Sequence, residues 1–325
     1  MQSVKNSSNT NTRSGSVTQV RSADYSSGWI SPPDNEVFHI SSEGVMPEIV
    51  FEVRTRALDA CQWSWTLKWD AKASGLRERA RKGEALRTFE MSGRYASSER
   101  KLTVDFGEEV VGGQLTVTLV LGEVTLNRTV TIQGKNPTAK EVSAFIETLE
   151  DMDGFDKVLE QETGCKHFIE LDGEPIVAFD QGYGITQMTN PAPSYEQAWS
   201  WKANIRAGSA IYQDKVREAQ AYLGKNERSY TPEQLQHEVL SRWNGGSYHQ
   251  WDSTSQAWVR KKNLLCDSEA SNIGWAMTLE KNKGKTEADL RARDKGTYRD
   301  GKKGQSAEHP WRYTGVCYAD HVLGE

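Results

Sequence analysis

The chain has 325 residues, a formal net charge of −5 at pH 7 and a mean hydropathy of −0.70. The acidic balance argues against nucleic acid as the main partner. No run approaches the roughly 18 apolar residues that a membrane-spanning helix needs, so a membrane is excluded as well. The 11 Trp residues exclude a chain that is disordered throughout, and the length allows two hydrophobic cores.

Residues 1–33 are rich in Ser, Asn and Thr and run into the sequence SPPD, a composition typical of a polar tail or linker. No apolar segment follows Met1, so this stretch does not have the pattern of a secretory signal peptide. We therefore expect a disordered polar tail or linker over residues 1–33, and delivery that does not depend on a signal peptide.

Residues 34–135 alternate apolar and polar side chains, which predicts β-strands. The clearest example is QLTVTLVLGEVTLNRTVTIQG, in which Leu115, Val117 and Leu119 share one face before a turn at residues 122–123. Short strands around a Trp-rich central strand indicate an all-β, immunoglobulin-like sandwich of about 100 residues. The charged stretch 73–100 fits either a helical insertion or a long loop.

From residue 136 to residue 325 the pattern is mainly helical, which places a domain boundary near residue 135. Thr138 and Glu141 are spaced as a capping box at the start of one helix. Thr231 followed by Pro232 marks the start of another. The sequence SYHQWDSTSQAWVRK predicts a small hairpin. The expected fold is therefore a multidomain chain, an N-terminal β-sandwich followed by a mainly α domain.

The cysteines do not have the spacing of a zinc site, because none of them forms a CxxC pair. Two interpretations remain open: buried free thiols, or one disulfide among the last three cysteines. His167 is interpreted as a structural or surface histidine. We expect neither a metal site nor a cofactor. The four cysteines are Cys61, Cys165, Cys266 and Cys317.

Two acids are candidates for chemistry, Glu162 and Asp180. Glu162 falls near the end of a short predicted helix whose other face is apolar, and partial burial there would raise its pKa toward the value that a general acid needs. Asp180 follows a polar excursion of the chain and precedes glycines at 182 and 184. The alternatives are ordinary ones: a solvated surface acid at 162, and a turn-forming Asp at 180.

Four short motifs resemble the lysozyme-like family of goose-type lysozymes and lytic transglycosylases. In EQETGCKHF, Glu162 with Thr163 resembles the family's catalytic Glu-Ser pair at the end of a helix. In DQGYGITQM, residues 184–187 resemble its G-[LI]-x-Q strand. NIRAG (204–208) resembles N-[IL]-x-x-G, and RWNGG (242–246) resembles A-Y-N-[AG]-G with Trp in the Tyr position. The resemblance covers roughly residues 140–250, and the segment after 260 has no counterpart.

This resemblance implies a lysozyme-like domain over residues 136–325 and a muramidase, a glycosidase that cleaves the β-1,4 bond between N-acetylmuramic acid and N-acetylglucosamine in peptidoglycan. Glu162 would be the general acid. If Asp180 activates water, the enzyme is an inverting hydrolase with carboxyl groups roughly 6.5–9.5 Å apart. If Asp180 only holds its loop, the enzyme is a lytic transglycosylase that gives 1,6-anhydro products. A non-catalytic peptidoglycan-binding module is the further alternative. The substrate-binding candidates are Tyr183, Gln187, Thr189, Trp243 and Asn244.

The wider pattern, a β-sandwich followed by GKNP and these motifs, resembles peptidoglycan-degrading effector modules of type VI secretion. That resemblance implies an antibacterial toxin, secreted without a signal peptide and acting in the bacterial periplasm or cell wall. It also implies three partners: peptidoglycan strands, a secretion spike protein and a cognate immunity protein. The basic segment 281–304 is either a solvated stretch or a contact for the acidic stem peptides of peptidoglycan.

Overall fold

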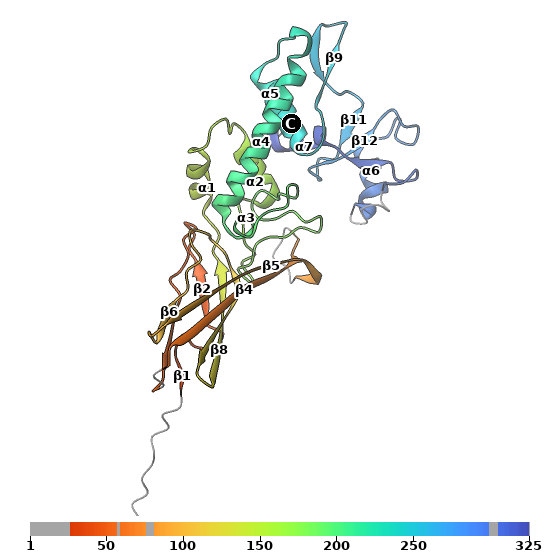
Figure 1. The fold of residues 1–325 in the computed structure, drawn as a ribbon. Coiled ribbons are helices and arrows are strands. Elements are labelled where there is room, and N and C mark those ends of the chain that lie inside the picture. The colour runs from red at the N-terminus through yellow and green to blue at the C-terminus, as the bar shows by residue number, and fades with distance from the viewer. Residues whose placement is uncertain (1–26, 57–58, 76–80, 299–304, 325) are drawn as a thin grey trace, which may run out of the picture.

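The structure is a computed structural model that describes residues 27–56, 59–75, 81–298 and 305–324. The predicted tail therefore lies outside the described residues up to residue 26. Its last part is ordered into strand β1 (Gly28–Ser31), which pairs with strand β3 (Val50–Arg54). Figure 1 shows two strand-rich layers at one end of the molecule and a group of helices in the middle. A smaller lobe, called the C-terminal lobe below and formed by residues 264–298 and 305–313, lies at the other end.

The N-terminal region contains two sheets. In the five-stranded sheet the order is β2-β8-β7-β4-β5, and in the three-stranded sheet it is β1-β3-β6. Strand β2 is parallel to β8, and the other pairs in both sheets are antiparallel. The remaining strands are β2 (Val37–Ile40), β4 (Cys61–Ala73), β5 (Lys82–Ser97), β6 (Lys101–Thr103), β7 (Gly113–Leu121) and β8 (Val124–Gly134).

The alternation in this region buries one face of each central strand. Leu115, Val117 and Leu119 are all fully buried, as predicted, and the turn between β7 and β8 falls at residues 122–123. The expectation for residues 73–100 is wrong, because most of this stretch is strand β5. As the edge strand of its sheet, β5 leaves most of its side chains in solvent. Apart from Phe89, few positions of the strand are buried, so apolar residues do not alternate with polar ones and the pattern that reveals a strand is lost.

The helices begin where the capping signals predict. Thr138 and Glu141 form a capping box at α1, and Thr231 accepts a hydrogen bond from the backbone of Gln234 at α5. Trp199 and Trp201 lie on two successive helices and both are buried. The α-helices are α1 (Ala139–Ile146), α2 (Phe155–Thr163), α3 (Tyr195–Trp199), α4 (Trp201–Leu223), α5 (Pro232–Trp243), α6 (Glu287–Asp294) and α7 (Gly315–Leu323). Two short 3-10 helices are η1 (Lys225–Glu227) and η2 (Lys295–Thr297).

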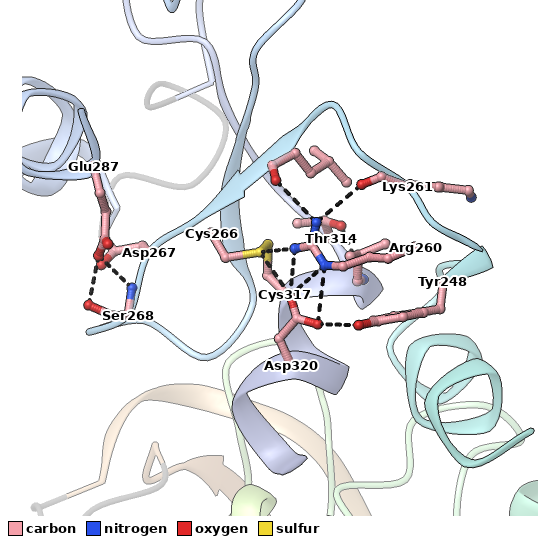
Figure 2. The surroundings of a disulfide bond; sticks show 12 residues. Tyr248, Arg260, Lys261, Cys266, Asp267, Ser268, Glu287, Thr314, Cys317 and Asp320 are labelled. Carbon is pink, nitrogen blue, oxygen red and sulfur yellow. Dashed lines mark hydrogen bonds and ion pairs between the residues drawn. A yellow bond between two sulfur atoms is a disulfide. The ribbon is translucent and has the colours of Figure 1, made fainter. Parts of the chain in front are cut away.

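Two small sheets follow α5. The predicted hairpin is present as β9 (His249–Asp252) and β10 (Ala257–Arg260), and a three-stranded sheet consists of β11 (Leu264–Cys266), β12 (Ile273–Ala276) and β13 (Trp311–Tyr313). A disulfide joins Cys266 at the end of β11 to Cys317 on α7 (Figure 2), so the alternative of one disulfide among the last three cysteines is the one observed. Cys61 and Cys165 are free thiols.

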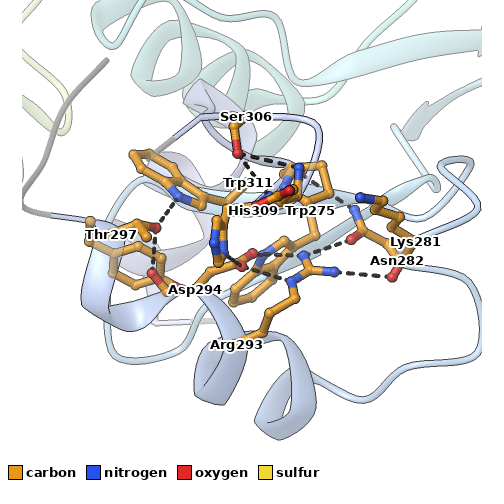
Figure 3. A network of polar contacts seen from close by, with 12 residues as sticks. Trp275, Lys281, Asn282, Arg293, Asp294, Thr297, Ser306, His309 and Trp311 are labelled. Carbon is orange, nitrogen blue, oxygen red and sulfur yellow. Dashed lines mark hydrogen bonds and ion pairs between the residues drawn. The ribbon is translucent and has the colours of Figure 1, made fainter. Parts of the chain in front are cut away.

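A buried polar network stabilises the C-terminal lobe. The Asp294 carboxylate accepts hydrogen bonds from Trp275 Nε1 at 2.8 Å and from Arg293, and it contacts His309 Nδ1 at 2.9 Å (Figure 3). Trp311 Nε1 donates to the hydroxyl of Thr297 at 2.8 Å, which links β13 to η2. Because the network joins residues of α6 and η2 to residues of β12 and β13, it fixes α6 against the small sheet.

The predicted fold class is wrong. The chain has mixed α and β content, 28% helix and 31% strand, and its five-stranded sheet is itself mixed because β2 runs parallel to β8. Besides the predicted hairpin, the three-stranded sheet of β11, β12 and β13 lies within residues 264–313, where mainly helix was expected. Its strands of three or four residues are too short to show a period of two, which is why the sequence pattern did not reveal them. The core of the N-terminal sheets also takes in Phe168, Tyr183 and Trp199, which lie beyond the expected boundary near 135.

No helix among the described residues is both long enough and apolar enough to span a membrane.

Candidate active site

A pocket of about 440 Å³ lies where the end of α2, the segment 178–190, α4 and the end of α5 meet. It brings together six of the seven residues that the sequence singled out, drawn from three separate parts of the chain. Both candidate carboxylates are among them. The lining residues are Glu162, Ala178, Asp180, Thr186, Gln187, Met188, Thr189, Asn190, Ile211, Lys215, Trp243 and Asn244.

Tyr183 is the exception, and its predicted role in substrate binding is wrong. Its side chain is only 2% exposed and belongs to the core of the N-terminal sheets. The ring lies edge-on to Trp69 and Phe89, with centroids 6.3 and 6.0 Å away. Tyr183 therefore helps to fix the pocket segment onto the β-sheet and does not contact a ligand in the pocket.

Helix α2 positions Glu162. The helix ends at Thr163, and Gly164 closes it in the left-handed conformation with φ of 61°. Phe155, Val158 and Leu159 are fully buried. Glu162 follows Leu159 by three residues and Val158 by four, so it lies on the same face of the helix, at the point where the helix leaves the core. Its carboxyl group is consequently only partly buried and reaches the pocket.

The surroundings of Glu162 favour its protonated form. Tyr318 Oη donates a hydrogen bond to Glu162 Oε1 at 2.8 Å, and Trp243 Nε1 donates to the same oxygen at 3.2 Å. Burial raises the pKa of Glu162 above its ordinary value. The two hydrogen bonds lower it, the nearby negative charge of Asp180 raises it, and the net direction is upward. Both donors are neutral and bind Oε1, which leaves Oε2 to carry the proton.

Asp180 lies in a different setting. It is exposed, and its Oδ1 accepts a hydrogen bond from the backbone N–H of Gly182 at 3.3 Å, which closes a local turn. It lines the same pocket as Glu162. One side chain can therefore serve as turn former and second carboxylate at once, because Oδ2 stays available to the pocket.

The motif residues contact one another and build the wall of the pocket. Asn204 Oδ1 accepts hydrogen bonds from Thr186 N at 3.0 Å and Thr186 Oγ1 at 2.8 Å, while its Nδ2 donates to Tyr183 O at 3.1 Å. A Cβ atom at Gly208 would lie 2.6 Å from Thr186 Cγ2, so only glycine allows this approach. Thr163 Oγ1 donates to Ile185 O at 3.1 Å, which ties α2 to the same segment.

His167 is a structural residue. It is fully buried, its Nδ1 accepts from the backbone N–H of Ile185 at 3.1 Å, and its Nε2 lies 2.9 Å from Ala198 O as the donor. Burial lowers the pKa of His167 to about 3, so the ring is neutral. A Cβ atom at Gly184 would lie 2.3 Å from His167 Cε1, which explains the glycine there.

Three residues in or beside the site were not found from the sequence. Tyr318 comes from α7, 156 residues after the carboxylate that it contacts, in the part of the chain without a recognisable motif. Lys215 reaches the pocket from α4 and pairs with Glu218 at 3.0 Å. Phe179 precedes Asp180 and is 76% exposed at the edge of the pocket segment. An aromatic residue directly before a candidate acid is the one feature that could have drawn attention to Phe179.

No protein-family model, no curated protein and no solved structure matches this chain. Across the described ranges, no group of three or more His, Cys, Asp or Glu side chains is placed to hold a metal ion. The pocket offers one partly buried carboxyl, one exposed carboxylate, the ammonium group of Lys215, and neutral amide and hydroxyl groups that include those of Gln187, Asn244 and Thr189.

Proposed function

We propose that this protein is a muramidase, a glycoside hydrolase that cleaves the β-1,4 bond between N-acetylmuramic acid and N-acetylglucosamine in bacterial peptidoglycan. The observation that carries the proposal is the state of Glu162. Its carboxyl group is partly buried, holds a raised pKa and is oriented through Oε1 by two neutral donors. A second carboxylate in the same pocket, Asp180, completes the pair that most glycosidases use.

The proposed reaction begins with the protonated Glu162. Its Oε2 donates the proton to the glycosidic oxygen as the bond to the anomeric carbon breaks and oxocarbenium character develops. Asp180 accepts a proton from a water molecule on the opposite face of the sugar, and the hydroxide oxygen bonds to the anomeric carbon. Glu162 ends ionised and Asp180 protonated, and exchange with solvent restores both.

The rest of the pocket is suited to a sugar. Gln187 Nε2 donates to Gly184 O at 2.7 Å, which fixes the amide and leaves its oxygen to accept from a sugar hydroxyl or acetamido N–H group. Thr189 and Asn244 add a hydroxyl and a second amide. Trp243 donates its indole N–H to Glu162, so its ring is also held in place beside the acid.

Lytic transglycosylase activity is the second candidate, and one observation favours it. Asp180 is exposed and its Oδ1 is engaged in a local turn, which is a sufficient role for an acid at that position. In that reaction Glu162 first protonates the leaving oxygen and then removes the proton of the muramic acid C6 hydroxyl, whose oxygen closes the 1,6-anhydro ring. The resemblance of the sequence motifs to type VI effector modules extends the proposal to a toxin that acts in the periplasm or cell wall, with a spike protein and an immunity protein as partners.

The test is digestion of purified peptidoglycan by the wild type, Glu162→Gln and Asp180→Asn, with the soluble fragments analysed by mass spectrometry. Glu160→Gln is the matched control, because Glu160 is an exposed acid on the same helix. Reducing-end fragments that disappear with both site variants support the hydrolase. Anhydro fragments that disappear only with Glu162→Gln identify the transglycosylase. If the wild type binds peptidoglycan but releases nothing, the enzyme proposal fails and a binding module remains.

A further inference from the structure

Helix α7 connects the C-terminal lobe to the proposed acid through two consecutive residues. Cys317 is bonded to Cys266 at the end of β11, and Tyr318 donates the shorter of the two hydrogen bonds that reach Glu162. Neighbouring side chains on an α-helix point about 100° apart. One face of α7 is therefore fixed to the small sheet while the adjacent face reaches the pocket.

The surroundings of the disulfide show that it is part of a larger attachment. Arg260 Nη2 lies 2.5 Å from Asp320 Oδ2 and 3.3 Å from Cys266 Sγ, and Tyr248 Oη donates to Asp320 Oδ1 at 2.7 Å (Figure 2). The guanidinium group of Arg260 thus contacts both α7 and the cysteine to which α7 is bonded. The polar contacts hold the next turn of α7, and the disulfide is the only covalent link between α7 and β11.

The helix fits closely at both of its neighbours. A Cβ atom at Gly274 on β12 would lie 2.7 Å from Cys317 Sγ, and one at Gly315 would lie 2.1 Å from Ser241 O on α5. Such contacts leave α7 little freedom as long as the disulfide is intact. A small displacement of α7 is enough to break the Tyr318 bond, because a hydrogen bond weakens steeply beyond its normal geometry.

We propose that the Cys266–Cys317 disulfide is a redox-sensitive latch that holds Tyr318 against Glu162 and makes full activity conditional on oxidation. In the oxidation step the two thiols lose two protons and two electrons, and a bond forms between the two Sγ atoms. The oxidant is a disulfide, either oxidised glutathione or the disulfide of an oxidoreductase, and it is reduced to two thiols. This inference rests on the proposed function, since it concerns the same carboxyl group.

The latch matches the compartments that the proposed function involves. Disulfides persist in the periplasm and outside the cell, whereas the cytosol keeps thiols reduced. A protein made in a reducing cytosol would hold α7 loosely and keep Glu162 poorly oriented. The same protein would reach its full activity in the compartment that contains peptidoglycan.

The other two cysteines provide controls. Cys165 is half-buried, and burial is the main cause that raises the pKa of its thiol to about 12, so it is a poor nucleophile for thiol exchange. Cys61 is buried in the core of the N-terminal sheets and contacts Arg100 Nη1 at 2.9 Å. A change in redox state under mild conditions should therefore act on the Cys266–Cys317 pair.

The experiment measures the initial rate of fragment release from peptidoglycan by the oxidised protein and by the protein reduced with dithiothreitol. We expect reduction to lower the rate by up to about tenfold, the upper end of the loss expected for one hydrogen bond between neutral groups, and oxidised glutathione to restore it. Cys165→Ser should respond as the wild type does. Oxidised Tyr318→Phe should already show the lower rate, and reduction should change it by less than about twofold. Far-UV circular dichroism tests whether the reduced protein stays folded.

Two results of the activity measurement would overturn the latch. One is an equal rate for the oxidised and reduced wild type. The other is a further tenfold loss when Tyr318→Phe is reduced, because the disulfide would then act through general loosening of the lobe. A second readout does not depend on activity: the pKa of Glu162, followed by carboxyl NMR, should rise on reduction because a hydrogen bond that lowers it is lost. No change in that pKa would also reject the latch, whereas absence of cleavage by the oxidised wild type would reject the proposed function.

Discussion

Two glutamates on neighbouring helices have pKa values that are shifted in opposite directions. Glu162 near the end of α2 and Glu238 in the middle of α5 both leave bulk water, and burial on its own raises the pKa of each. For Glu162 the rise remains. For Glu238 the net shift is downward, because hydrogen bonds from the side chain and backbone of His249 and the charge of Arg242 outweigh burial.

The difference is in the charge and number of the donors. Glu238 Oε2 accepts from the backbone N–H groups of Tyr248 and His249 at 3.0 Å each, and Oε1 lies 2.9 Å from Arg242 Nη2. Glu162 has two neutral donors, both on one oxygen, and a negative neighbour in Asp180. A fully paired carboxylate stabilises the fold, whereas a carboxyl with neutral donors and one free oxygen is suited to proton transfer.

The largest effect that distinguishes the two glutamates is expected for Glu162→Gln. Loss of a general acid should lower the rate of peptidoglycan cleavage by roughly 10²–10⁴-fold. The free energy of unfolding at neutral pH should stay equal or rise by about 0.5–1 kcal/mol, because the pKa of Glu162 is raised by burial in the folded protein and a carboxyl with a raised folded pKa costs stability at neutral pH. Peptidoglycan digestion and denaturant titration measure the two effects. A variant that loses stability and activity together would make Glu162 a structural residue.

Glu238→Gln should instead lower the stability of the fold. Removing one partner of a buried ion pair leaves Arg242 with only the longer contact to Glu218, at 3.8 Å, and we expect a loss of roughly 3 kcal/mol in the free energy of unfolding. Because the folded pKa of Glu238 is lowered, its contribution is present above the unfolded pKa and is lost as the pH falls through the folded value. Denaturant titrations at several pH values test this, with Glu233→Gln as the exposed control on the same helix. Equal stability of the two variants would contradict it.

The sequence could predict that Glu162 ends a helix at the edge of a core, but not which side chains contact its carboxyl group. The apolar residues before Glu162 and the glycine after it show that this acid ends a helix at the edge of a core. Trp243 was recognisable through its motif, whereas Tyr318 was not. Its contact joins positions 156 apart, and no local pattern encodes a distance between two such elements. Tyr183 was misplaced for a related reason: its neighbours predict an exposed loop, but Trp69 and Phe89, far earlier in the chain, cover its ring.

The pH dependence of cleavage should move in opposite directions in two variants. A general acid is active below its pKa, so the rate falls as the pH rises through that value. Tyr318→Phe removes a hydrogen bond that lowers the pKa of Glu162, so the alkaline limb should shift to higher pH while kcat falls about tenfold. Asp180→Asn removes a charge that raises the pKa, so its alkaline limb should shift to lower pH. If the alkaline limbs of the two variants shift in the same direction, Glu162 is ruled out as the titrating acid.

The smallest expected effect concerns Phe179, which has no counterpart near Glu238. Its ring is 76% exposed, and Phe179 lies in the chain between two residues that line the pocket, Ala178 and Asp180, so we expect it to stack on a sugar chain that extends beyond the pocket. An aromatic contact of this kind contributes about 0.5–1.5 kcal/mol, so Phe179→Ala should raise KM for peptidoglycan about three- to tenfold and leave kcat and the pH profile unchanged. Leu171→Ala is the control, an exposed apolar side chain (66%) that is not adjacent in the chain to a residue lining the pocket. If Phe179→Ala instead lowers kcat at unchanged KM, the ring acts on the position of Asp180, and sugar stacking is rejected.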